Sequence, residues 1–169
     1  IFLPIQEPPR SGTLCDFTEN SLHRHSISYW EDFFKPKIVW GEISDRSKFA
    51  YEGKGVFVPE ATTFLMVGRQ LPYLLCILNS PLSEWFFSKV GTTTGVGTVR
   101  WKKYTIQELI IPQIAQTDEQ FFEEQVEKFI NDAINLQHIT SSVNKRIYSI
   151  VGLNDEEISF VENFYPAIL

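Results

Sequence analysis

The residues best suited to chemistry lie in one segment, residues 91–104. It begins with a glycine and threonine loop that holds no side chain larger than valine, and it continues into a cationic stretch without acidic residues. Backbone N–H groups and hydroxyls bind phosphates and base edges, and lysine and arginine side chains neutralise phosphate charge. The candidate residues are Thr92, Thr93, Thr94, Gly95, Gly97, Arg100, Lys102 and Lys103. This pattern predicts a polyanion-binding surface; the alternative is an ordinary surface loop beside a cationic strand.

The net charge of -6 argues at first against a nucleic-acid partner, but the charge is unevenly distributed. Residues 105–169 hold 11 of the 21 Asp and Glu but only 3 of the 15 Lys and Arg. A second basic group in the first half is interleaved with acidic residues, and comprises Lys35, Lys37, Arg46, Lys48 and Lys54. Ordinary solvated surface charge explains this second group equally well.

No catalytic or metal-binding site is predicted. Asp45, Glu52 and Lys54 resemble the acidic and Glu-x-Lys arrangement of metal-dependent nucleases, although this spacing is common by chance. The three histidines have no carboxylate or cysteine at ligand spacing, and the glycine loop lacks the Gly-Lys-Ser/Thr of a nucleotide-binding loop. Nuclease chemistry therefore remains the weakest of the alternatives.

The 169 residues are 43% hydrophobic and 14% aromatic, which is typical of one folded domain or of a domain with an appended arm. The longest apolar run is far too short to span a membrane. Cys76 lies in an apolar helical run, so both cysteines are interpreted as free and reduced and the protein as cytoplasmic. Because the chain begins at Ile1 without a signal peptide, we expect it to be a piece of a longer protein.

Residues 1–28 are interpreted as a loop-rich entry segment. Alternation and β-branched runs predict strands at residues 37–40, 49–51, 56–58, 62–67 and 99–104, with a glycine hairpin turn at residues 52–55. In the last of these strands, Arg100 and Lys102 would share one face and Trp101 and Lys103 the other. Helices are predicted at residues 71–78 and 81–90, the second capped by Ser80 and ended by Gly91.

In the last third of the chain, apolar residues recur in alternating steps of four and three, which predicts a helix with a heptad seam. The seam residues are Phe122, Val126, Phe129, Ala133, Leu136, Thr140, Val143, Ile147 and Ile150. A continuous helix over this span would be about 42 Å long. It would either pack back onto its own domain or pair, through residues 118–151, with a helix of a partner. Gly152 would end it, and Asn154 with Glu157 forms a capping box that opens a short final helix.

Six blocks in one order carry a family resemblance: residues 37–40, 43–51, 74–82, 100–103, 110–112 and 147–153. Together they resemble the TaqI-like C-terminal specificity domain of N6-adenine DNA methyltransferases and of type IIG restriction-modification enzymes. The resemblance covers about residues 29–165. It implies a mixed α/β fold with a small mixed sheet and packed helices, similar to the target recognition domains of type I specificity subunits, followed by a long C-terminal helical arm.

The resemblance implies a division into an entry segment (1–28), a DNA target recognition domain (29–115) and a helical arm (116–169). It implies duplex DNA and the methyltransferase domain of the same parent chain as partners. S-adenosylmethionine, and in some relatives Mg²⁺, would serve the parent enzyme, which flips out the target adenine and in some relatives also cuts DNA. The catalytic Asn-Pro-Pro-Tyr motif of such relatives is missing here, so no cofactor and no catalysis are expected in this fragment.

The turn at residues 44–48 and the segment 91–103 match the DNA-facing regions of the family. This adds Arg46 and Lys48 to the candidate DNA contacts, beside Arg100, Lys102, Lys103 and the threonines. The leading hypothesis is sequence-specific recognition of duplex DNA. The main alternative is an interaction or spacer module that holds a partner through the heptad helix.

Overall fold

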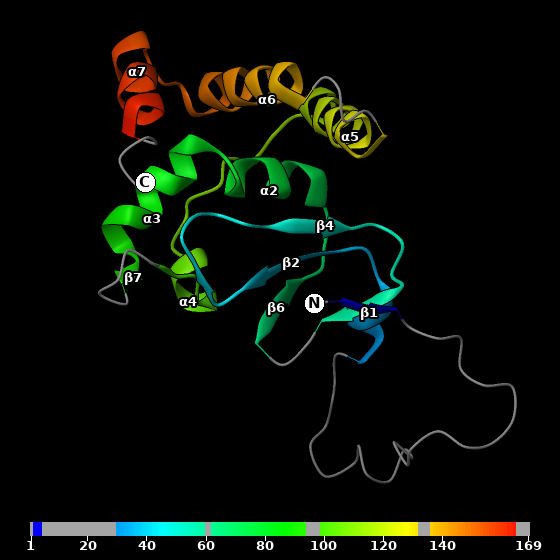
Figure 1. The fold of residues 1–169 in the computed structure, drawn as a ribbon. Coiled ribbons are helices and arrows are strands. Elements are labelled where there is room, and N and C mark those ends of the chain that lie inside the picture. The colour runs from blue at the N-terminus through cyan, green and yellow to red at the C-terminus, as the bar shows by residue number, and fades with distance from the viewer. Residues whose placement is uncertain (1, 5–29, 60–61, 94–98, 132–135, 165–169) are drawn as a thin grey trace, which may run out of the picture.

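The computed structural model describes residues 2–4, 30–59, 62–93, 99–131 and 136–164. In this part of the chain, short antiparallel strands are supported by helices, so the predicted mixed α/β class is confirmed (Figure 1). The β-structure forms three small antiparallel sheets where a single mixed sheet was expected. No described helix is long and apolar enough to cross a membrane.

The central sheet has the order β4–β2–β6. Its strands are β2 (Lys37–Gly41), β4 (Ala50–Glu52) and β6 (Thr63–Met66), close to the predicted ranges. Helix α2 (Leu71–Leu78) contacts β2 and β4, and its other side contacts the C-terminal helices (Figure 1). The molecule is therefore layered here, with α2 between the sheet and the C-terminal helices.

The predicted hairpin at residues 52–55 is wrong in its pairing. Gly55 does adopt a positive φ of 67°, but β5 (Phe57–Pro59) pairs with β1 (Phe2–Pro4) and not with β4. A side chain at Gly55 would clash with the carbonyl oxygen of Phe34, in the short helix η1 (Trp30–Phe34). The turn thus brings the chain against η1 and sends it away from β4.

Both predicted helix-entry signals are confirmed. Helix α3 (Pro81–Val90) begins at Ser80, whose Oγ accepts a hydrogen bond from the N–H of Ser83 at 3.3 Å. Helix α7 (Asp155–Phe164) begins with a reciprocal capping box, in which Asn154 and Glu157 each accept the other's backbone N–H. These caps satisfy donors that the first turn of a helix leaves unpaired.

The heptad segment forms two antiparallel helices, α5 (Gln116–Asn131) and α6 (Leu136–Val151), and not one rod. Asp118 Oδ1 lies 2.7 Å from Arg146 Nε, whereas one straight helix would hold these residues about 42 Å apart. Four seam residues are buried within this chain, namely Phe122, Val126, Val143 and Ile147, while Phe129, Leu136 and Thr140 are exposed. Packing back onto the domain is thus confirmed; seam residue Ala133 lies outside the described residues.

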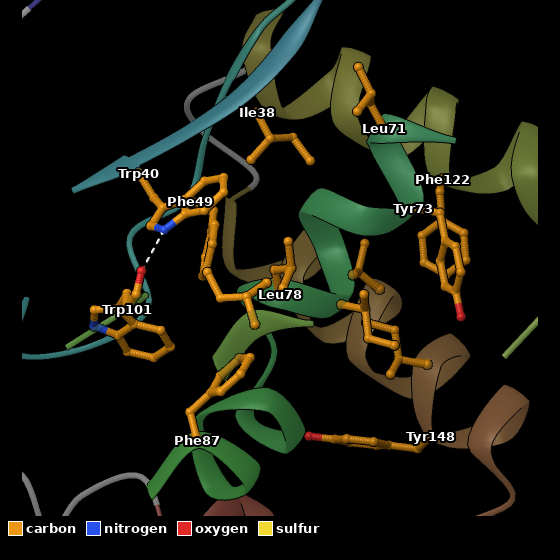
Figure 2. Close-up of a cluster of buried hydrophobic side chains, with 14 of the residues drawn as sticks. Ile38, Trp40, Phe49, Leu71, Tyr73, Leu78, Phe87, Trp101, Phe122 and Tyr148 are labelled. Atoms are coloured by element: carbon orange, nitrogen blue, oxygen red, sulfur yellow. Dashed lines mark hydrogen bonds between the residues drawn. The ribbon is translucent and has the colours of Figure 1, made fainter. Parts of the chain in front are cut away.

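Aromatic residues form the part of the core that lies under the candidate site. Three of these rings pack together (Figure 2). The ring centroid of Phe49 lies 5.5 Å from that of Trp40 and 5.8 Å from that of Trp101. Trp40 Nε1 donates a hydrogen bond to the carbonyl oxygen of Trp101 at 2.8 Å. Phe87 of α3 lies 5.1 Å from the Trp101 ring. This cluster joins the central sheet, α3 and the cationic segment.

Candidate nucleic-acid interface

The two predicted DNA-facing segments meet in one three-stranded sheet, with the order β3–β8–β7. Strand β3 (Ile43–Ser44) pairs with β8 (Val99–Arg100), and β8 pairs with β7 (Thr92–Thr93). The sequence indicated both segments but not that they pair, because strand pairing joins residues far apart in the chain. The pairing creates a single surface from residues that are far apart in the chain.

Trp101 fixes which side of this sheet faces outward. Its side chain is 3% exposed, and its backbone N–H donates to the carbonyl oxygen of Glu42 at 2.7 Å. Since Val99 also packs against the core, Arg100 between them points outward. The predicted placement of Arg100 and Trp101 on opposite faces is confirmed.

The predicted strand over residues 99–104 is too long. Strand β8 ends at Arg100, and helix α4 (Lys103–Ile106) begins after Lys102, whose carbonyl oxygen accepts the N–H of Ile106. Ile106, the last residue of α4, is buried in the hydrophobic core. Lys103 is therefore an exposed residue of a helix and not the partner of Trp101 on a strand face.

Three of the candidate cations are paired with carboxylates. Arg100 Nη1 lies 3.0 Å from Glu42 Oε1, Lys48 Nζ lies 2.5 Å from Asp45 Oδ1, and Arg46 Nε lies 3.7 Å from Asp45 Oδ2. The hydrogen bond from Lys48 is the main reason why the pKa of Asp45 is lowered. Exposed pairs of this kind stabilise a protein little, so a phosphate can compete for the cations.

Lys102 and Lys103 differ from these three, because neither forms an ion pair within the described part of the chain. Lys103 is exposed, and Lys102 Nζ lies 5.8 Å from the centroid of the Tyr104 ring. Thr92 is exposed on β7. Thr94, Gly95 and Gly97 lie outside the described residues. The strongest unneutralised positive charge at the site therefore comes from the two lysines that follow β8.

Gly91 brings β7 close to α3, as its predicted role at the helix end requires. A Cβ at this position would lie 2.5 Å from the carbonyl oxygen of Phe87 and 2.9 Å from Cγ1 of Val99. Such distances are too short for a side chain, so any other residue would push β7 away from the helix and from β8.

Sequence reasoning missed the residues that hold the turn at 44–49. Glu84 of α3 is 4% exposed, and its Oε1 accepts both the backbone N–H and the hydroxyl of Ser47, at 2.5 and 2.6 Å. Asn79 bonds both the N–H and the carbonyl of Phe49. The sequence signal at Glu84 was its position in the first turn of a helix, which explains an acidic residue there without any tertiary contact.

We predict that Glu84→Ala destabilises the protein by about 1–3 kcal/mol, because Ser47 loses the acceptor for two buried donors. Chemical denaturation measures the effect. Glu84→Gln, which keeps one acceptor oxygen, should lose less. Glu156→Ala, an exposed residue in the first turn of α7, is the control and should change little. Equal stability of Glu84→Ala and Glu156→Ala would contradict this role.

The nuclease-like residues are not gathered as a metal site. Glu52 Oε2 lies 2.5 Å from the buried Lys37 Nζ, and its Oε1 accepts the backbone N–H of Lys54 at 2.8 Å. Asp45 is occupied with Lys48. Among the described residues, no group of three His, Cys, Asp or Glu could hold a metal ion. Cys76 is free and partly buried, and burial raises the pKa of its thiol to about 12.

The fold and the site thus define a small mixed α/β domain in which helices support an antiparallel sheet with a cationic outer face. A family model described as a TaqI-like C-terminal specificity domain matches residues 11–112, which is more than half of the chain. The chain belongs to this family. Its specificity domains serve DNA sequence recognition in restriction-modification enzymes and are not themselves catalytic. No curated protein matches the chain significantly.

The match differs in extent from the resemblance described above. It begins at residue 11, inside the entry segment 1–28 that the resemblance did not cover, and it ends at Pro112. The block at residues 147–153 and the helices α5–α7 therefore lie beyond it. Both segments of the candidate interface lie within the match.

Proposed function

We propose that this chain is the target recognition domain of an N6-adenine DNA methyltransferase or of a combined restriction-modification enzyme, and that it reads a base sequence in duplex DNA. The observation that carries this proposal is the pairing of β3 with β8, which unites the two cationic segments on one outward face. A groove-facing sheet needs such convergence, because base edges and flanking phosphates are contacted together.

The charge distribution supports a polyanionic partner at this face. Five candidate cations lie in or close after β3 and β8 in the chain: Arg46, Lys48, Arg100, Lys102 and Lys103. The acidic helix α5 packs instead on α2 (Figure 1). Figure 1 shows α5 on the opposite side of the view from β7. The negative charge of this helix therefore lies away from β7.

Methyl transfer would take place in another domain of the parent chain, which would bind S-adenosylmethionine and flip out the adenine. Any DNA cleavage by the parent, with Mg²⁺, would likewise belong to that other part. The role of the present chain is to place the target base by gripping the duplex around it.

Selection from a randomised duplex library tests the proposal. The chain should enrich a short common motif, and binding to that motif should exceed binding to a scrambled duplex by at least 10³-fold, the lower end for specific recognition. Affinity should also fall steeply as salt is raised. Absence of binding to any duplex at low salt would refute the proposed function.

One observation favours a second function, pairing with a partner helix. Phe129 and Ile130, near the end of α5, are 51% and 62% exposed, whereas Phe122 and Val126 on the same helix are buried. Sedimentation at several concentrations, with and without duplex, separates the two functions. A spacer module should form oligomers in the absence of DNA and show no affinity for it.

A further inference from the structure

A row of three side chains crosses the outward face of the sheet β3–β8–β7. Ile43 is the register partner of Arg100, and Arg100 is the register partner of Thr92. Directly opposed residues of antiparallel strands point to the same face, with Cβ atoms about 5 Å apart. The row thus offers an aliphatic group, a guanidinium and a hydroxyl, in that order.

Ile43 is unusual in this row because it is 56% exposed while the opposite face of the same sheet packs on the core. A single exposed isoleucine needs no explanation in itself. The position of Ile43 does need an explanation, because Ile43 lies directly beside Arg100 on the face that we propose contacts DNA. Contact with a partner would remove its apolar surface from water.

Arg100 is held in place and still has donors to offer. Its Nη1 lies 3.0 Å from Glu42 Oε1. A guanidinium has five N–H donors, so one pairing with a carboxylate orients the group and leaves others free. In the major groove, guanine presents two acceptors that suit an arginine, and thymine presents a methyl group that suits an aliphatic side chain.

We propose that Ile43 is a specificity-determining residue that contacts the 5-methyl group of a thymine in the major groove, beside a base contacted by Arg100. The proposal rests on the proposed function and deepens it. The spacing supports it, since side chains about 5 Å apart reach the same or neighbouring base pairs, which stack about 3.4 Å apart.

The test uses the duplex selected by the wild-type chain, with each thymine replaced in turn by deoxyuridine, which lacks only the methyl group. At one position, wild-type affinity should fall about fourfold, which corresponds to about 0.8 kcal/mol for one buried carbon group. Ile43→Ala should bind the thymine duplex more weakly and should not distinguish thymine from uracil at that position. Its dependence on salt should be unchanged, because no phosphate contact is removed.

Ile110→Ala is the matched control, because Ile110 is 89% exposed and lies outside this sheet. It should discriminate thymine from uracil as the wild type does. The proposal is overturned if the selected motif has no methyl-sensitive thymine, if Ile43→Ala keeps the discrimination, or if it weakens all duplexes equally. In those cases duplex binding itself persists, so the proposed function stands. Loss of all binding by the wild type would instead refute that function.

Discussion

Replacement of Arg100, Lys102 and Lys103 together by alanine is expected to lower duplex affinity by about 10²–10³-fold at moderate salt. The three cations follow one another around the end of β8, and two of them form no ion pair with a described residue. Each phosphate contact contributes about 0.9 to the slope of log affinity against log salt. The slope should therefore decrease by up to about 3, which a titration at several salt concentrations measures.

The matched control is Lys54, Lys128 and Lys145 replaced together by alanine. This triple variant removes the same formal charge from exposed positions outside the sheet β3–β8–β7. It should retain most of the affinity and nearly the full slope, because general attraction between distant charges is screened by salt. Equal losses in the two triple variants would mean that net charge, and not this sheet, determines binding.

Lys37→Ala is expected to destabilise the protein by about 3–5 kcal/mol. The Lys37 side chain is 0% exposed, and its ammonium donates to Glu52 Oε2 at 2.5 Å and to the carbonyl oxygens of Phe33 and Lys35 at 2.9 and 3.3 Å. The variant leaves the Glu52 carboxylate and two carbonyl groups without this donor. Denaturant unfolding measures the loss.

The double variant Lys37→Met, Glu52→Gln should be more stable than Lys37→Ala, because a buried pair removed as a whole leaves no unpaired charge. Lys35→Ala is the control, since the side chain of Lys35 is exposed and its pair with Asp32 should contribute less than about 1 kcal/mol. If Lys37→Ala were as mild as Lys35→Ala, the buried pair would contribute little to the fold.

The buried pair of Lys37 and Glu52 also predicts that the stability of the protein depends on pH. Burial by itself would raise the pKa of Glu52, but hydrogen bonds from Lys37 and from backbone N–H groups outweigh it and hold the pKa below the ordinary 4.5. A carboxyl with a lowered pKa in the folded state stabilises the protein above its unfolded pKa, and the contribution is lost as pH falls through the folded value. Unfolding measured from pH 7 downward should therefore show a loss of stability below about pH 4.5 that is smaller in Glu52→Gln.

Much of the local structure follows from the sequence. Helices α2 and α3 have the predicted bounds, and the caps at Ser80 and Asn154 form as expected. These features depend on residues within one or two turns of each other, whose preferences act before any tertiary contact forms. The cationic character of residues 91–104 and the placement of Arg100 and Trp101 on opposite faces were predicted on the same local basis.

Other features could not be predicted, because they depend on pairs of distant residues. Lys37 was grouped with surface cations, yet it is buried, since its partner Glu52 lies on the neighbouring strand. The heptad seam left open whether this segment packs back onto its own domain or pairs with a partner helix. The contact between Asp118 and Arg146 shows that it folds back as two helices. Periodicity describes which face is apolar, but it does not say what covers that face.

The sequence by itself determined the types of chemical group available to this protein, the helices that carry its core, and its resemblance to a family of specificity domains. Only the tertiary structure decided that β3 and β8 pair, that Glu84 holds the adjoining turn, and that Ile43, Arg100 and Thr92 form one row. The physical reason is that strand register and buried hydrogen bonds join groups such as Glu42 and Arg100, which are 58 residues apart. Their pairing depends on the geometry of the whole fold, so the spacing of residues along the sequence does not indicate it.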